Sequence, residues 1–196
     1  MSKFDKTIVK LVHNKALWNG WSKLHGLEFD YTDSTGKLVN FGREVLERKP
    51  AVAVLLVDPS RKTTLMVRQF RAPVYLAGEA AFLLEVPAGV IDSGAAEDTA
   101  CREVLEETGY QISAPRFLFA AYMSPGAVTE KIHFFYAEIS DGQKVASGGG
   151  LEDEHEDLEL LEVPIVQALE MISTGEIIDA KTIMLLQWAA LNGLGG

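Results

Sequence analysis

The chain has 196 residues, of which 47% are hydrophobic, and this is enough to build one sizeable core. Its 28 acidic residues against 18 basic ones give a net charge of -10, which disfavours binding to nucleic acid by simple electrostatics. No apolar run approaches the roughly 20 residues that span a bilayer, and no signal-peptide pattern follows Met1, so we expect no membrane association and a cytoplasmic location.

The first half of the chain reads as paired strands. Strand signals at 27–31 and 38–45 flank Asp33-Ser34-Thr35-Gly36, a typical turn sequence, and predict a small antiparallel hairpin. A second hairpin is predicted from strand signals at 51–57 and 63–69, on either side of Asp58-Pro59-Ser60.

A short strand is then expected at Phe82 to Glu85, followed by a glycine-rich loop and a helix from near Ala95 to Thr108. Gly109 is the expected C-cap of this helix. The single cysteine, Cys101, shares an apolar helix face with its neighbours, so it is expected to be a small core residue.

The sequence of the second half of the chain predicts strands at 117–122 and 132–139, followed by two helices near the C-terminus. Pro164 is expected to open the first helix, which runs to Ser173, and Asp179 to cap the second, which ends near Asn192. Strands around a central helix, with helices added late, predict an α/β fold with a mixed sheet between helices.

Three carboxylates gather on the central helix. Glu103 and Glu107 are four residues apart and project from the same face, with Glu106 beside them. Like charges so placed repel one another, whereas a bound Mg²⁺ turns the repulsion into coordination. The alternative is an ordinary solvated face on which Arg102 relieves the repulsion.

The loop and helix together resemble the signature of the Nudix hydrolases. Gly89 matches its first glycine, and Arg102-Glu103, Glu106-Glu107 and Gly109 match its second half. The chain departs from the signature in two respects: Gly89 and Arg102 are one residue closer, and Ala95 stands where the family has a glutamate.

The resemblance implies a Nudix α/β/α sandwich over 47–196, preceded by an N-terminal antiparallel strand segment, 1–46, that serves in dimerisation and base binding. Four further segments are similar to the nucleoside diphosphate sugar pyrophosphatases, and in particular to the subgroup that cleaves GDP-mannose. They are 68–71, 122–130, 148–154 and 175–182. The implied activity is Mg²⁺-dependent hydrolysis of GDP-mannose to GMP and mannose 1-phosphate by a homodimer.

The same resemblance assigns the metal site. The backbone carbonyl of Ala88 and the carboxylates of Glu103 and Glu107 would bind Mg²⁺, with Mn²⁺ as an alternative. Glu154 follows three glycines and is expected to join them when substrate binds. Glu103, Glu107 and Glu154 are therefore the expected catalytic residues.

Seven residues are expected, from the resemblance, to contact the substrate. They are Arg71 at the phosphates, Lys181 at the phosphates or sugar, Glu130 and Asp153 at the sugar side, and Trp21, Arg43 and Glu44 at the base. Structural roles compete with these assignments, for example a surface arginine at position 71 or a core tryptophan at position 21.

Two alternative functions remain open. ADP-ribose could be the preferred substrate of the same chemistry. A nucleotide-sugar sensor that binds without cleaving is the other alternative, because Ala95 removes one acid of the family signature. The intact Glu103, Glu106 and Glu107 argue against the sensor.

Overall fold

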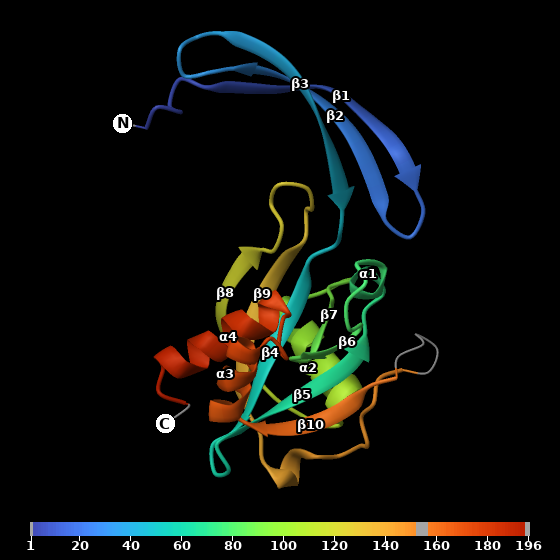
Figure 1. The fold of residues 1–196 in the computed structure, drawn as a ribbon, viewed down its shortest axis with the longest axis vertical. Coiled ribbons are helices and arrows are strands. Elements are labelled where there is room, and N and C mark those ends of the chain that lie inside the picture. Colours follow the sequence, from blue (N-terminus) through green and yellow to red (C-terminus); the bar gives the residue numbers. More distant parts are fainter. Residues whose placement is uncertain (1, 152–156, 195–196) are drawn as a thin grey trace. The chain divides into compact units, whose positions relative to one another are not determined.

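A computed structural model describes residues 2–151 and 157–194 of the chain (Figure 1). The chain divides into two compact units. The N-terminal unit comprises Met1–Lys49 and Tyr122–Glu130, and the C-terminal unit comprises Pro50–Ala121 and Lys131–Gly196. The N-terminal unit thus takes in a loop that lies far along the sequence from its strands.

The N-terminal unit is built on a three-stranded antiparallel sheet with the order β1-β2-β3. Its strands are β1 (Ile8–Asn19), β2 (Lys23–Thr32) and β3 (Leu38–Glu47). The turn after β2 forms because Asp33 Oδ1 accepts hydrogen bonds from the backbone N–H groups of Thr35, at 2.8 Å, and Lys37, at 3.0 Å. The expected first hairpin is therefore confirmed.

Strand β1 is not predicted by the sequence pattern. All of its residues are exposed, so no buried face imposes a period of two on its apolar positions. Many large apolar side chains of the N-terminal sheet are exposed, and we call them the exposed apolar set: Ile8, Val9, Leu11, Val12, Leu17, Trp18, Leu38 and Val39.

The C-terminal unit contains a mixed sheet with the order β10-β5-β4-β9-β8, in which β6 also pairs with β5 and β7 with β4. Strand β4 runs parallel to β9 and antiparallel to β5 and β7. The strands are β4 (Ala51–Asp58), β5 (Thr63–Phe70), β6 (Phe82–Glu85), β7 (Ala88–Val90), β8 (Arg116–Tyr122), β9 (Lys131–Glu138) and β10 (Glu159–Pro164).

Helices lie on both faces of this sheet. In Figure 1, α3 and α4 lie in front of the sheet and α2 lies behind it, so the expected sandwich is confirmed. The helices are α1 (Ala72–Leu76), α2 (Ala96–Thr108), α3 (Ile165–Thr174) and α4 (Ala180–Leu191), with a short 3-10 helix at Asp141–Gln143. No helix in residues 2–151 or 157–194 is long and apolar enough to cross a membrane.

Strand β4 is the centre of the core. Val52, Val54 and Leu56 are fully buried and belong to one cluster with Ala100 and Val104 of α2. Helix α2 is therefore held against the sheet by its apolar face, which leaves its carboxylates on another face.

Cys101 is partly buried against this same cluster, as expected for a small core residue. Burial raises the pKa of its thiol, and the nearby charges of Glu97 and Asp98 raise it further. The thiol is therefore a poor nucleophile at neutral pH.

Candidate active site

Helix α2 presents the acidic residues of the candidate site. The helix ends at Gly109, whose φ of 76° is the left-handed C-cap conformation and whose N–H donates to the carbonyl of Leu105 at 2.9 Å. Arg102 forms ion pairs of 2.6 Å with both Glu103 and Glu106. Arg102 thus relieves part of the charge repulsion on this face, as expected if the face were an ordinary solvated one.

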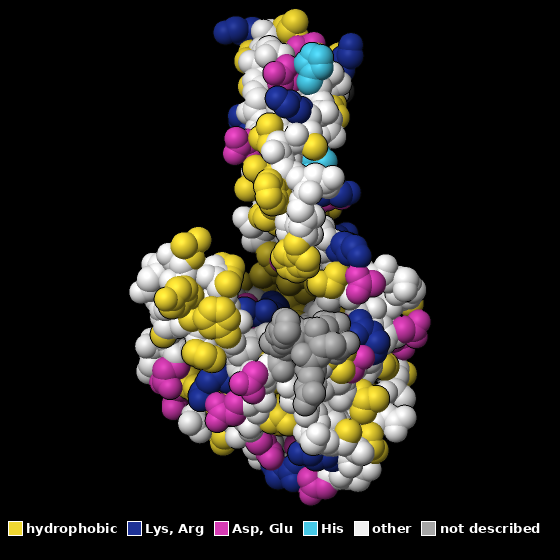
Figure 2. All heavy atoms as spheres, turned by 90° about the vertical axis from the view of Figure 1, so that its right-hand side faces the viewer, with side chains coloured by type: hydrophobic (Ala, Val, Ile, Leu, Met, Phe, Trp, Pro, Cys, Tyr) yellow, Lys and Arg dark blue, Asp and Glu magenta, His cyan; other side chains and the backbone are white. Residues whose placement is uncertain are grey.

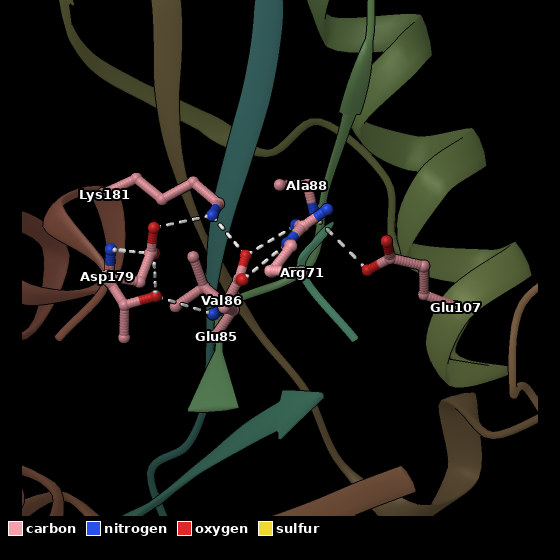
Figure 3. Close-up of polar contacts among 8 residues, drawn as sticks. Arg71, Glu85, Val86, Ala88, Glu107, Asp179 and Lys181 are labelled. Carbon is pink, nitrogen blue, oxygen red and sulfur yellow. Dashed lines mark hydrogen bonds and ion pairs between the residues drawn. The ribbon is translucent and has the colours of Figure 1, made fainter. Parts of the chain in front are cut away.

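Glu107 differs from the other two carboxylates in its burial. It is only 1% exposed, and its Oε2 accepts a hydrogen bond from the backbone N–H of Ala88 at 3.2 Å (Figure 3). A carboxylate buried to this degree is costly unless hydrogen bonds or cations compensate it. The contact places Glu107 directly against β7, the short strand that precedes α2.

Gly89 brings the same strand against Glu103. A Cβ atom added at Gly89 would lie 1.9 Å from the Glu103 carboxyl carbon and 2.1 Å from Oε1. No side chain larger than hydrogen fits there while Glu103 keeps this position. The family glycine is therefore explained by close approach of the backbone to a carboxylate.

Strand β7 and helix α2 together supply oxygen atoms of the kind that a hard divalent cation prefers as ligands. Glu103 and Glu107 approach adjacent residues of β7, Ala88 and Gly89, so the expected ligands Ala88, Glu103 and Glu107 lie close together. Within the described residues, no three side chains of Asp, Glu, His or Cys converge as a complete metal cluster. In the described part of the chain, the residues expected as ligands therefore do not form a complete metal cluster by themselves.

A second polar cluster, drawn in Figure 3, lies at the end of β6. Glu85 is only 1% exposed and receives a bidentate pair from Arg71, with Nε and Nη2 each 2.7 Å from a carboxylate oxygen. Lys181 Nζ also donates to Glu85, and it donates to Asp179 at 2.8 Å. We call Glu85, Arg71, Lys181 and Asp179 the buried ion cluster.

Opposite charges inside the buried ion cluster shift the pKa values of their partners so that the charged forms are favoured. Burial alone would raise the pKa of Glu85, but the hydrogen bonds and charges of Arg71 and Lys181 outweigh it and lower the pKa. Burial lowers the pKa of Arg71, but the hydrogen bond and charge of Glu85, with the charges of Asp179 and Glu107, raise it overall. Glu85 and Arg71 are therefore both charged at neutral pH.

Helix α4 is tied to β6 through its first turn. Asp179 caps the helix by accepting hydrogen bonds from the Thr182 backbone N–H, at 2.9 Å, and hydroxyl, at 2.6 Å. The Thr182 hydroxyl oxygen in turn accepts from the backbone N–H of Val86 at 2.9 Å. The expected N-cap is confirmed, and it fixes α4 to the residue that follows Glu85.

The buried ion cluster contains two of the expected substrate-binding residues, Arg71 and Lys181. Sequence reasoning missed Glu85 as a functional candidate and assigned Asp179 only a capping role. The available signal was a single acid, Glu85, that ends the apolar run Phe82-Leu83-Leu84. A charged residue at the end of a buried strand requires partners, because an isolated buried carboxylate is rare.

Trp21, Arg43, Glu44 and Glu130 belong to the N-terminal unit. Trp21 is 88% exposed, and the Arg48 guanidinium lies 4.2 Å from the centre of its ring. Arg48 also lies 3.9 Å from a carboxylate oxygen of Glu130. Trp21 is thus an exposed ring backed by a cation, and the competing reading of it as a core residue is wrong.

Arg43 and Glu44 help to line an open pocket of about 630 Å³ on the N-terminal sheet. The Arg43 guanidinium lies 4.5 Å from the centre of the Phe41 ring and donates to the carbonyl of Gly42 at 2.8 Å. The pocket is also lined by His13, Asn14, Lys15, Leu17, Gly26, Leu27, Glu28 and Gly42. Asp153 and Glu154 lie outside the described residues.

Figure 2 shows one face of the surface, on which acidic and basic side chains are interspersed over the globular part. No broad basic surface is visible on this face. The distribution agrees with the net charge of -10.

Comparison with known proteins relates this arrangement to a family. The NUDIX domain model matches residues 47–186. GDP-mannose pyrophosphatase of Escherichia coli O1:K1 / APEC is 44% identical over 187 residues, which cover 95% of this chain and 97% of that protein. The enzyme of the same name from Shigella dysenteriae serotype 1 is 43% identical over the same coverage.

A solved structure, described as that of an ADP compounds hydrolase, has a similar fold. Its TM-score is 0.72 with 18% sequence identity, and the match covers 95% of this chain and 96% of that one. At this identity the likeness concerns the fold alone.

Proposed function

This chain belongs to the Nudix family, and on that premise we propose that it is a pyrophosphohydrolase that cleaves GDP-mannose into GMP and mannose 1-phosphate. The observation that carries the proposal is the 44% identity to a GDP-mannose pyrophosphatase over 95% of the chain. The matched length exceeds the 47–186 range of the family domain, so the similarity includes residues outside that domain.

Family membership implies a divalent cation, and we propose Mg²⁺, with Mn²⁺ as a substitute. Ala88, Glu103 and Glu107 would hold it, and Glu154 would complete the ligand set. When bound, the cation would neutralise phosphate charge and lower the pKa of water. A water molecule would attack one phosphorus atom and lose its protons to solvent, the bridging P–O bond would break, and the leaving phosphate would take the electron pair.

We propose that the remaining residues bind the substrate in parts. Arg71 and Lys181 would contact phosphate oxygens, for which cationic N–H donors are suited. Glu130 and Asp153 would contact the sugar. Trp21 would stack on the base, with Arg43 and Glu44 as polar contacts. The 88% exposure of Trp21 supports this role.

We also propose that the protein is a homodimer whose N-terminal sheet forms part of the interface. Support comes from the exposed apolar set, because many large apolar side chains exposed on one small sheet are expected at an interaction site. Light scattering of the purified chain should give twice the 21.4 kDa chain mass. The cytoplasmic location expected from the sequence stays a prediction.

A turnover panel tests the proposed function. GDP-mannose and ADP-ribose would be compared by monophosphate release with Mg²⁺, with Mn²⁺ and with EDTA. We expect metal-dependent release with the higher kcat/KM for GDP-mannose. Faster cleavage of ADP-ribose would make ADP-ribose the assigned substrate and leave the proposed pyrophosphate hydrolysis unchanged. Tight binding of nucleotide sugars without turnover would favour the sensor.

A further inference from the structure

We propose that Glu85 is a positioning residue that holds Arg71 and Lys181 in the orientation needed to receive substrate phosphates. This inference rests on the proposed pyrophosphatase function. Its basis is that two cations assigned separately to the substrate converge on one buried carboxylate. They come from distant places in the chain, with Arg71 14 residues and Lys181 96 residues from Glu85.

The bidentate contact fixes the plane of the Arg71 guanidinium. A guanidinium has five N–H donors in a rigid fork. Glu85 uses one on Nε and one on Nη2, each at 2.7 Å. Two parallel bonds leave no freedom to rotate, so the other donors, those of Nη1 included, keep a set direction.

Lys181 is held in a comparable way from the opposite side of Glu85 (Figure 3). Its ammonium has three donors, of which one goes to Glu85 and one to Asp179. Asp179 is itself immobilised by two hydrogen bonds from Thr182. A flexible lysine chain is thereby restricted to one position, and among residues 2–151 and 157–194 these two contacts use only two of its three donors.

The charge balance of the buried ion cluster explains why Glu85 suits this task. Two cations face two carboxylates, so the group is neutral in the absence of substrate. Because Glu85 is 1% exposed, leaving its carboxylate without a cation would carry a large desolvation penalty, and both cations stay in place. Phosphate oxygens would meet donors that are already oriented, which avoids an ordering cost at binding.

Glu85→Gln tests the inference, because glutamine keeps the shape and removes the charge. If the oriented cations bind substrate and transition state alike, KM for GDP-mannose should rise about tenfold while kcat changes less than about threefold. The matched control is Glu159→Gln, which removes an exposed carboxylate that pairs with Arg68 at 2.8 Å on the adjacent strand pair. The control should leave both constants unchanged.

A double-mutant cycle separates positioning from a purely structural role. If Glu85 acts through Arg71 and Lys181, Glu85→Gln should raise KM less in an Arg71→Gln background than in the wild-type chain, because only its effect through Lys181 would remain and the two changes would not be additive. Additive effects would overturn the inference. So would an unchanged KM accompanied by a lowered melting temperature, because that pattern indicates support of the fold alone.

Arg71→Lys is a second variant that tests the same inference if Glu85→Gln does not fold. Lysine preserves the charge and loses the planar fork, so a positioning role predicts a similar rise in KM. An unchanged KM for Arg71→Lys would overturn the inference. Failure of the wild-type chain to cleave any nucleotide sugar would instead refute the proposed function, and the two failures are therefore distinguishable.

Discussion

Gly89→Ala should abolish most activity and leave the fold intact. The new Cβ would lie 1.9 Å from the Glu103 carboxyl carbon, and ordinary contact begins at 3.4 Å, so the carboxylate must move by about 1.5 Å. Mg²⁺ demands near-ideal geometry at about 2.0–2.1 Å, and a shift of this size removes Glu103 as a ligand. We expect a loss of at least about 100-fold in kcat/KM, or about 2.7 kcal/mol in transition-state stabilisation.

The stability of this variant should hardly change. Gly89 is not among the glycines with positive φ, so alanine can adopt its backbone conformation. The atom that must move is the end of a flexible side chain, and a glycine-to-alanine change at a compatible position stabilises by about 0.4–1 kcal/mol through the unfolded state.

Three measurements on purified Gly89→Ala decide the matter: kcat/KM for GDP-mannose, the dissociation constant for Mg²⁺ and the melting temperature. Gly142→Ala is the matched control, because a Cβ there meets nothing within 4 Å. Wild-type activity in Gly89→Ala would refute the reasoning, since it would show that Glu103 need not occupy this position. A large drop in melting temperature would show that the clash is not absorbed by the side chain.

Other substitutions probe single features. Glu107→Gln keeps an acceptor for the Ala88 N–H and removes the charge, so we expect a normal melting temperature and a loss of at least about 100-fold in turnover. Near-wild-type turnover at saturating Mg²⁺ would mean that residue 107 is not a metal ligand. Ala95→Glu adds a carboxylate at the N-cap of α2, which should stabilise the folded chain by roughly 0.3–1 kcal/mol. We expect activity to change less than about tenfold. A large gain in activity would support a sensor role for the natural chain. Trp21→Ala should weaken binding of GDP-mannose and ADP-ribose alike, by about 1–3 kcal/mol. Arg48→Met is the control for the cation behind the ring. A changed preference between the two substrates, measured as the ratio of their kcat/KM values, would contradict simple stacking.

Local sequence signals predicted the elements that carry strong periodicity or defined caps. Helix α2 ends where Gly109 predicts, and Asp179 caps α4 as expected. Strands β1, β7 and β10 and the short helix α1 were not predicted. Strand β1 has no buried face, and β7 has only three residues, so neither could produce a clear pattern.

The candidate site was predicted unevenly because spacing reveals only neighbours within one element. The four-residue interval between Glu103 and Glu107 placed both on one helical face. No interval could predict that Arg71, which follows β5, and Lys181, from α4, would converge on Glu85. Such long-range contacts are set by packing of the sheet against α4.

The burial of Glu107 bears on the choice between enzyme and sensor. The presence of an acidic cluster is a weak argument for catalysis, because Arg102 already relieves the repulsion between Glu103 and Glu106. Glu107, in contrast, is 1% exposed, and a protein that only bound nucleotide sugars could replace a buried charge with an apolar residue at little cost or with a gain in stability. The Ala88 N–H of β7 and the charge of Arg71 compensate this carboxylate in part, and a bound cation would compensate it further. The buried position of Glu107 therefore supports a metal-dependent enzyme more strongly than the number of acids on the helix does.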